Sequence, residues 1–521
     1  MHATSSIRFP TPMTATTASP TPACDALEAL HRRLHHLGHL AAIAGWDQAT
    51  MMPPGGNEAR AAALAELAGL THRLRTDPTL GDTLKRAHDE GLDDDRRANL
   101  REIEREWRLA NALPAELVER RQLATSRCEH AWRTQRPAND WGGFLENFRE
   151  VLAVSREEAA RLSDLTGLSR YDALMDRFEP GMTSAVVDRV FGDLRGWLPD
   201  LIARVRARQA AQGEPPPAPV GPFPVAAQRA LCEQLMGLLG FDFAAGRLDV
   251  SAHPFCGGVP EDVRLTTRFR EDECLASLMG TIHETGHARY EQNLPRAWLG
   301  QPLAQARSMA VHESQSLAFE MQLARHPGFV ARQLAPRLAQ AFGAQPAFEP
   351  RALGRLLTRV EPGRIRVDAD EVTYPAHVLL RWEIERPLIE GEIGPEDIPA
   401  LWDEKMQALL GLDTRGDHRD GALQDVHWPE GLFGYFPCYT LGAMLAAQWF
   451  AALRRARPAL DDEITAGDFS GLFGWLREHV WSQGSRWPTD ELTRRASGEP
   501  LNPAHLRAHL EARYLSDGFA G

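Results

Sequence analysis

Residues 271–291 read EDECLASLMGTIHETGHARYE and contain the pattern H-E-x-x-H at positions 283–287. On an α-helix, His283 and His287 lie one turn apart on the same face. Two imidazoles placed in this way can occupy two of the four positions around a tetrahedral zinc ion. Glu284 lies about 100° around the helix, beside the metal, where a general base for the attacking water belongs. The stretch therefore predicts a zinc site on a helix.

The apolar positions of this stretch support a helix. Leu275 and Met279 extend the row of the two histidines at four-residue spacing. We expect Glu271 and Asp272 in the first turn, where acidic side chains interact favourably with the helix dipole. Gly280 and Gly286 each weaken the helix by up to about 1 kcal/mol relative to alanine, which suggests a need for close packing at both.

The five-residue pattern alone leaves an alternative open, because it also occurs in proteins that bind no metal. A third ligand would decide between the two interpretations. A metzincin continuation is absent, since Tyr290 and Asn293 stand where its glycine and third histidine belong. The remaining solution is a glutamate from a later helix, as in His₂Glu zinc sites.

A second helix is predicted from residues at helical spacing, namely Ala306, Ala310, Glu313, Leu317 and Met321. Glu313 interrupts this apolar row, and a buried carboxylate requires a cation or a proton. A zinc ion on the two histidines is the obvious partner, so Glu313 is the predicted third ligand. Glu291 and Glu320 are the rival ligands; Glu291 follows on the histidine helix, and Glu320 is interpreted as a surface charge.

Further motifs resemble the carboxypeptidase Taq family of metallocarboxypeptidases over about residues 25–521. Together they are far more specific than the zinc pattern. They are H-E-S-Q-S at 312–316, H-P-F at 253–255, D-x-R-x-T at 262–266, I-R-x-x-A-D at 365–370, G-x-x-Q-D-x-H-W at 421–428 and W-D-Q-A-T-M-M-P at 46–53. One departure is Cys438, where threonine is expected.

The resemblance implies a mainly α-helical, single large metallopeptidase fold with a deep substrate groove and a small β element beside the zinc helix. It implies hydrolysis of the C-terminal peptide bond, with broad specificity, one divalent metal ion (Zn²⁺, with Co²⁺ as the alternative) and a homodimer. The oxyanion of the tetrahedral intermediate needs hydrogen-bond donors besides the metal. His427 and Tyr435 are the candidates, and packing in the core is their alternative role.

A carboxypeptidase must also recognise a free carboxylate, and the planar fork of an arginine matches it. The resemblance points to Arg366 in the I-R-x-x-A-D segment. Arg364 and Arg264 are further candidates, and a structural ion pair is the alternative for each arginine. His253 and Asp425 are expected to orient neighbouring groups.

Composition restricts the class of protein. The chain has 521 residues and a net charge of −13, which disfavours a nucleic-acid binder because phosphate contacts need clustered basic residues. Six scattered cysteines without a C-x-x-C pattern favour reduced thiols and a cytoplasmic protein. No apolar run is long enough for a membrane span.

Along the chain, residues 1–24 are predicted to form a disordered tail and residues 25–521 the catalytic domain. The first helix is expected near Asp25, with a solvated face carrying the histidines at 31, 35, 36 and 39. A second metal site on these histidines is the alternative. Residues 46–56 are expected to break the helix, 171–183 and 213–224 to form loops, and 248–269 to form a β-hairpin. Helices are predicted over 57–163, with interruptions, and over 379–389, 398–410 and 441–453.

These features predict a metal-dependent carboxypeptidase that acts on peptides with a free C-terminus. A zinc-dependent endo-oligopeptidase is the first alternative, and cleavage of a peptide with an amidated C-terminus would favour it. A helical binding protein with an inactive zinc motif is the second alternative. That protein would lack Glu284 or a ligand, but all four residues are present.

Overall fold

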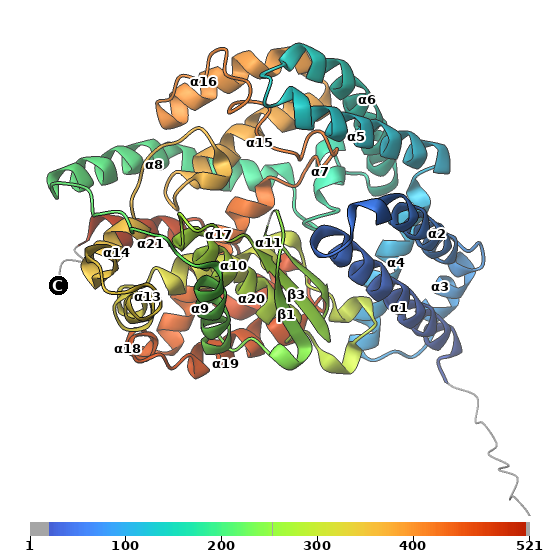
Figure 1. Cartoon of the computed structure of the whole chain (residues 1–521). Coiled ribbons are helices and arrows are strands. Elements are labelled where there is room, and N and C mark those ends of the chain that lie inside the picture. Colours follow the sequence, from blue (N-terminus) through green and yellow to red (C-terminus); the bar gives the residue numbers. More distant parts are fainter. Residues whose placement is uncertain (1–19, 253, 517–521) are drawn as a thin grey trace, which may run out of the picture.

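The computed structural model describes residues 20–252 and 254–516 (Figure 1). Helices make up most of this part of the chain, which confirms the predicted mainly α fold. Their bounds are α1 (Pro22–Thr50), α2 (Asn57–Arg75), α3 (Leu80–His88), α4 (Asp94–Ala112), α5 (Ala115–Gln135), α6 (Trp141–Thr166), α7 (Arg170–Met175), α8 (Ser184–Ala211), α9 (Val225–Leu238), α10 (Leu275–Glu291), α11 (Met309–Leu317), α12 (Pro327–Phe329), α13 (Ala335–Phe342), α14 (Pro350–Leu357), α15 (Tyr374–Glu390), α16 (Ile398–Leu410), α17 (Pro437–Ala456), α18 (Leu460–Ala466), α19 (Ser470–His479), α20 (Thr489–Ser497) and α21 (Ala504–Leu515).

The β element is a three-stranded sheet in front of α10 (Figure 1). Its strands are β1 (Gly246–Val250), β2 (Cys256–Val259) and β3 (Asp262–Thr267). β2 and β3 pair antiparallel, which confirms the predicted hairpin, and β1 adds a strand parallel to β3. The central strand β3 leads into α10 after a short connection, so the sheet lies beside the H-E-x-x-H helix as predicted.

The core joins segments that are far apart in the sequence. α17 packs along α11, and Gly442 of α17 makes their close approach possible. A Cβ atom at Gly442 would lie 2.8 Å from Cβ of Glu313, which is too close for any side chain. The position of Glu313 therefore depends on a residue that follows it by more than 120 positions in the chain.

Several predicted boundaries differ from the structure. α1 begins at Pro22, three residues before Asp25, and continues to Thr50, so the expected break begins only at Met51. Part of the predicted 171–183 loop is helical, because Ser169 caps α7 by accepting a hydrogen bond from the amide of Asp172. Apart from Pro20, Thr21 and the first turn of α1, the predicted tail lies outside the described residues.

The histidines of α1 do not share one solvated face. His31 is buried against the small core formed by α1, α3 and α4, whereas His36 is exposed. Burial lowers the pKa of His31 to about 4, and the nearby charge of Arg75 acts in the same direction. The prediction of a solvated face is therefore wrong for His31, because leucines on both sides of it turn this part of α1 towards α3 and α4.

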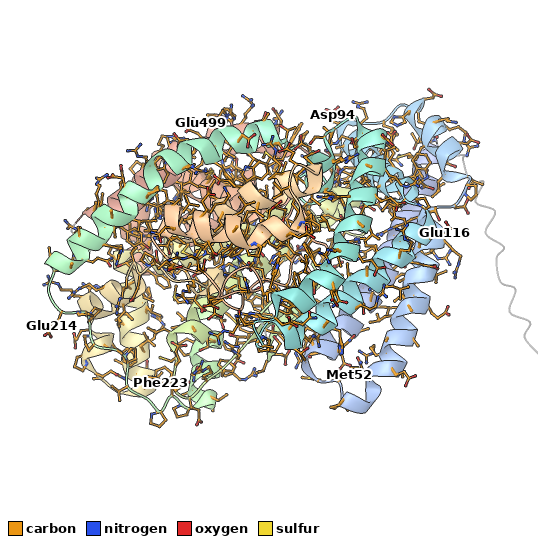
Figure 2. The ribbon with its side chains drawn as sticks, turned by 90° about the horizontal axis from the view of Figure 1, so that it is seen from above. Met52, Asp94, Glu116, Glu214, Phe223 and Glu499 are labelled. Atoms are coloured by element: carbon orange, nitrogen blue, oxygen red, sulfur yellow. The ribbon has the colours of Figure 1, made fainter. Side chains whose placement is uncertain are left out.

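The other helix and loop predictions agree with the structure. Helices cover 379–389, 398–410 and 441–453, and the Pro-rich residues 213–224 form the connection between α8 and α9. Figure 2 shows α8 along one edge of the molecule, with Glu214 just beyond its end. None of the helices in the described part has the length and apolar character needed to cross a membrane. The deep substrate groove stays a prediction.

Candidate active site

The H-E-x-x-H pattern lies on α10, as predicted, but the first turn of the helix differs. Glu271 and Asp272 precede the helix, and Asp272 pairs with Arg270 instead. The carboxylate of Glu273 accepts hydrogen bonds from the amides of Leu275 and Ala276, so it satisfies two of the free donors of the first turn.

Gly286 allows α10 and α11 to touch through their backbones. A Cβ atom there would lie 2.4 Å from the carbonyl oxygen of Gln315 and 2.7 Å from Cα of Ser316. Nothing lies within 4 Å of the corresponding point at Gly280. The close packing suggested by the sequence is therefore real at Gly286 and absent at Gly280.

The second helix begins later than its apolar row suggests. The Ser308 hydroxyl accepts a hydrogen bond from the amide of Val311 and caps α11. The buried carboxylate of Glu179 accepts another from the amide of Ala310. Ala306 therefore lies before the helix, while Glu313 lies on its second turn and faces α10.

Three side chains converge between these helices. Oε2 of Glu313 lies 3.4 Å from Nε2 of His287 and 3.8 Å from Nε2 of His283. Among the described residues, these three form the group whose ligand atoms all lie within 4.8 Å of one another. The structure thus brings together His283, His287 and Glu313, the three residues predicted as ligands.

The spacing of these atoms fits one tetrahedral metal ion. Two ligand atoms about 2.1 Å from a tetrahedral zinc are separated by about 3.4 Å. The carboxylate–imidazole distances of 3.4 and 3.8 Å agree with this value. Two imidazoles and a carboxylate are also the donor set of His₂Glu zinc sites.

The other ring nitrogen of each histidine has a partner that orients it. Nδ1 of His283 lies 2.9 Å from Oε2 of Glu320, and Nδ1 of His287 lies 3.1 Å from the carbonyl oxygen of His312. Each Nε2 atom is therefore directed towards Glu313, because an outer acceptor fixes the tautomer and the ring orientation.

Glu320 is not the surface charge that the sequence suggested. Its carboxylate is mostly buried and also pairs with Arg325 at 2.9 Å. The chain changes from α-helix to π-helix over Ala318–Ala324, and this wider turn brings Glu320 to His283. The other rival, Glu291, lies 2.8 Å from Nε2 of His312.

Glu284 lies beside the three predicted ligands in a largely water-free position. Burial raises the pKa of its carboxyl group to about 7, and the negative charge of Glu313 adds to this effect, while His283 opposes it. A carboxyl group that gains and loses its proton near neutral pH is suited to general acid–base chemistry.

A buried cluster of charges surrounds Arg366. Its Nε and Nη2 atoms donate to Oδ1 of Asp425, and Nη1 donates to the hydroxyl of Tyr374 at 2.7 Å. Arg381 donates to Oδ2 of the same aspartate at 2.5 Å. Burial alone would raise the pKa of Asp425, but the two guanidinium groups outweigh it and lower that pKa. Two cations thus share one carboxylate.

Tyr374, Tyr435 and Tyr439 lie close to both this cluster and the predicted ligands. Burial raises the pKa of all three hydroxyls, and the charges of both Glu313 and Arg366 act on each of them. Within residues 20–252 and 254–516, the Tyr435 hydroxyl has no hydrogen-bond partner. It is therefore a free donor near Glu313.

His427 lies on the Arg366 side of these tyrosines. Its ring stacks on Phe436 at a centroid distance of 4.4 Å, and Nε2 lies 2.9 Å from the hydroxyl of Tyr439. Nδ1 is buried and has no partner in the described structure. Burial lowers the pKa of His427 to about 4, so the ring is neutral at physiological pH.

The other predicted arginines have contacts outside this cluster. Arg264 on β3 holds the carboxylate of Asp262 through two hydrogen bonds, and its guanidinium lies 4.5 Å from the ring centroid of Trp46. Arg364 pairs with Asp417. The motifs at 46–53 and 262–266 therefore meet each other. His253 lies outside the described residues.

Sequence reasoning missed several residues of this site. Arg381 carries no motif, so only its ion pair with Asp425 identifies it. Tyr439 lies on the first turn of α17 and Tyr435 precedes that helix, so helical spacing does not link the two hydroxyls. Tyr374 lies four residues after the I-R-x-x-A-D segment, but nothing local links it to Arg366.

Comparisons with known proteins identify the family of this chain. Residues 26–514 match the family described as carboxypeptidase Taq (M32) metallopeptidase. Thermostable carboxypeptidase 1 of Thermus thermophilus is 39% identical, over 96% of this chain and 99% of that protein. Carboxypeptidase 1 of Bacillus subtilis is 33% identical, over 93% and 96%.

Solved structures give the same result at the level of the fold. Metallocarboxypeptidase 1 of Trypanosoma cruzi superposes with a TM-score of 0.93 at 48% identity, over 95% of this chain and all of that chain. The M32 carboxypeptidase of Deinococcus radiodurans has a TM-score of 0.90 at 34% identity, over 96% and 100%. The chain therefore belongs to the carboxypeptidase Taq (M32) family and is a metal-dependent carboxypeptidase.

Proposed function

We propose that His283, His287 and Glu313 hold one Zn²⁺ ion, with Co²⁺ as the alternative metal. The observation that carries this proposal is the convergence of two oriented imidazoles and one carboxylate at tetrahedral spacing. A zinc ion bound there lowers the pKa of water and polarises the carbonyl group of the scissile bond.

Glu284 is the proposed general base. Its position next to His283 and its pKa of about 7 allow it to take a proton from the attacking water at neutral pH. The same carboxyl group can then return that proton to the leaving amine. Both proton transfers use one side chain, because the attacked carbon and the leaving nitrogen are adjacent atoms.

Arg366 is the proposed anchor for the substrate's C-terminal carboxylate. Among the described residues, Arg366 and Arg381 pair with the same carboxylate, that of Asp425, which leaves the buried cluster with a surplus of one positive charge. A substrate carboxylate would balance this charge, and Arg366 still has N–H groups that Asp425 and Tyr374 do not occupy. Tyr374 and Tyr439 lie next to both the anchor and Glu313.

Tyr435 and His427 are the proposed donors near the reacting carbonyl. The free hydroxyl of Tyr435 lies close to Glu313, where an oxyanion would form. His427 acts through Tyr439, whose hydroxyl it contacts at 2.9 Å. Arg264 stays a predicted substrate-binding residue, although Asp262 already occupies one edge of its guanidinium group.

A pair of blocked dipeptides, one with a free and one with an amidated C-terminus, tests this function. We expect release of the last residue from the free form only. This release should disappear with a chelator and return with Zn²⁺ or Co²⁺. Equal cleavage of the amidated peptide would instead identify an endo-oligopeptidase, the first alternative. The absence of metal-dependent cleavage would identify an inactive binding protein, the second alternative.

We further infer that residues 25–521 act as one catalytic domain, in a cytoplasmic homodimer of broad specificity. The six free cysteines support a reducing compartment. Exposed apolar side chains on and just after α1, namely Leu40 and Met51, support burial against a second copy. Light scattering coupled to gel filtration measures the oligomeric state directly.

A further inference from the structure

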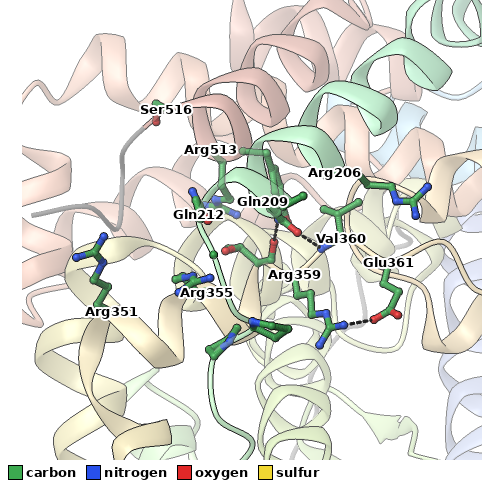
Figure 3. Close-up of a pocket in the computed structure, with 16 residues that line it drawn as sticks. Arg206, Gln209, Gln212, Arg351, Arg355, Arg359, Val360, Glu361, Arg513 and Ser516 are labelled. Atoms are coloured by element: carbon green, nitrogen blue, oxygen red, sulfur yellow. Dashed lines mark hydrogen bonds and ion pairs between the residues drawn. The ribbon is translucent and has the colours of Figure 1, made fainter.

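A cavity of about 420 Å³ lies between the end of α8, the connection that follows it, α14 and α21 (Figure 3). It shares no residue with the metal centre or with the Arg366 cluster. Among the described residues that line it, Glu361 is the acidic one. The cationic residues that line it are Arg206, Arg351, Arg355, Arg359 and Arg513.

Two of the five arginines are neutralised by carboxylates. Arg359 pairs with Glu361 at 2.8 Å. Arg513 pairs with Glu371 at 3.2 Å and donates to the carbonyl oxygens of Met321 and Gln322.

The other three have no carboxylate partner among the described residues. These are Arg206, Arg351 and Arg355. Arg355 donates to the carbonyl oxygen of Glu214 at 2.9 Å, which carries no net charge. The cavity therefore holds a surplus of positive charge, in a protein whose net charge is −13.

The arginines come from separate elements that meet at the cavity. Arg351 and Arg355 are one turn apart on α14, so they project from the same face. Figure 3 shows Arg355 near the middle of the group, with Arg351 and Arg206 towards opposite sides. An extended anion could contact them in succession.

The wall opposite α14 is held in place. Gln209 of α8 donates to the carbonyl oxygen of Thr358 at 2.8 Å and accepts from the amide of Val360 at 3.1 Å. Pro215 and Pro216 line the cavity with a restricted backbone. Gln209 thus ties the end of α8 to the segment that follows α14.

We propose that this cavity binds a small molecule that carries two or more phosphate-type negative charges. Guanidinium groups bind phosphate oxygens through paired hydrogen bonds, and several unpaired arginines in one concave site attract such an anion strongly. A volume of about 420 Å³ lies in the usual range for small-molecule sites. An acidic peptide is the alternative ligand, and the titration below distinguishes it from a phosphate-type anion.

Calorimetric titration of the metal-loaded protein with pyrophosphate at low salt tests the proposal. We expect binding at one site and at least tenfold weaker binding to the double variant Arg351→Gln/Arg355→Gln. Arg206→Gln should weaken binding severalfold. The matched control is Arg33→Gln, which removes the same charge from an exposed position on α1 and should change the affinity less than twofold. Circular dichroism and the thermal midpoint without anion verify folding.

The variants distinguish anion binding in this cavity from anion binding elsewhere on the protein. All of them keep the metal centre, so anion binding to the metal would be equal in each protein. Equal affinity in wild type and the double variant, an equal loss in Arg33→Gln, or no binding at millimolar pyrophosphate would overturn the proposal. Tighter binding of hexaglutamate than of pyrophosphate would also overturn it, in favour of an acidic peptide. A parallel titration with adenosine diphosphate shows whether the phosphates alone are recognised or an organic part adds affinity.

Discussion

Nδ1 of His283 lies 2.9 Å from Oε2 of Glu320, and the same carboxylate pairs with Arg325. Burial alone would lower the pKa of His283, but Glu320 and Glu313 outweigh it and raise that pKa to about 10. Nδ1 of His283 thus faces Glu320, and Nε2 of the same ring faces Glu313. We therefore expect this carboxylate to position the ring rather than to bind a metal itself.

Replacement of Glu320 by glutamine should weaken zinc binding by about 10- to 100-fold, the usual effect of losing an outer partner of a ligand histidine. The side chain keeps its size, but Arg325 loses its counter-charge. Competition with a coloured chelator measures the zinc affinity. Glu119→Gln, an exposed substitution on α5, should leave it unchanged. An unaltered affinity in Glu320→Gln would show that Glu320 does not orient His283.

The two glycines of α10 provide a matched pair of variants. Gly286→Ala should lower the melting temperature and reduce bound metal, because its Cβ atom would overlap the backbone of α11 and displace Glu313. Gly280→Ala should keep the metal and gain up to about 1 kcal/mol of stability, since alanine favours a helix and the space is open. Thermal unfolding and metal analysis check both; normal metal content in Gly286→Ala would contradict the proposed packing.

The site residues that the sequence predicts are those that stand out by their spacing within one helix. His283 and His287 are four residues apart on one helix, and Glu313 is a carboxylate in an apolar row, so chemistry and spacing indicate all three. The structure brings these residues together, and the mainly helical fold with a β-hairpin before α10 is confirmed. Each of these features depends on residues within a single helix or hairpin.

The parts that sequence reasoning missed depend on irregular backbone or on distant contacts. Glu320 reaches His283 because the helix widens into a π-helix at Ala318, and regular helical spacing cannot indicate that change. Arg381 contributes through Asp425, 44 residues away. His31 looked like part of a solvated face, because its burial depends on how α3 and α4 pack against α1.

Glu284→Gln should bind metal normally and lose turnover by about 10²–10⁴-fold, which is the usual contribution of a general base. Glutamine keeps the shape of the side chain but cannot accept the proton of the attacking water. Release of the C-terminal amino acid measures turnover, and metal analysis confirms an occupied site. Glu284→Asp, which keeps the carboxylate but shortens its reach, should retain more activity than glutamine. Substantial turnover by Glu284→Gln would refute the assignment.

Arg366→Lys should reduce kcat/KM for peptides with a free C-terminus by about tenfold or more, equivalent to about 1.4 kcal/mol. Lysine keeps the charge but loses the planar fork that binds a carboxylate through two hydrogen bonds. The preference for free over amidated C-termini should fall by the same factor. Arg364→Lys is the matched control, because Arg364 is more exposed and pairs with Asp417. An unchanged preference in Arg366→Lys would exclude it as the anchor.

The burial of His31 predicts a pH-dependent stability of the α1, α3 and α4 core. The pKa of this histidine falls from its usual 6.5 to about 4 because of burial, with a contribution from Arg75. A neutral His31 therefore stabilises the fold fully above pH 6.5, and this stability is lost as the pH falls towards 4. At pH 5 the free energy of unfolding is therefore lower by about 2 kcal/mol.

The melting temperature of wild type should fall more between pH 7 and pH 5 than that of His31→Leu. Glu106, 3.9 Å from His31, is retained in both proteins, so its own titration affects both. His36→Leu, at an exposed position of the same helix, should follow wild type; parallel curves for wild type and His31→Leu would show that His31 is not held neutral.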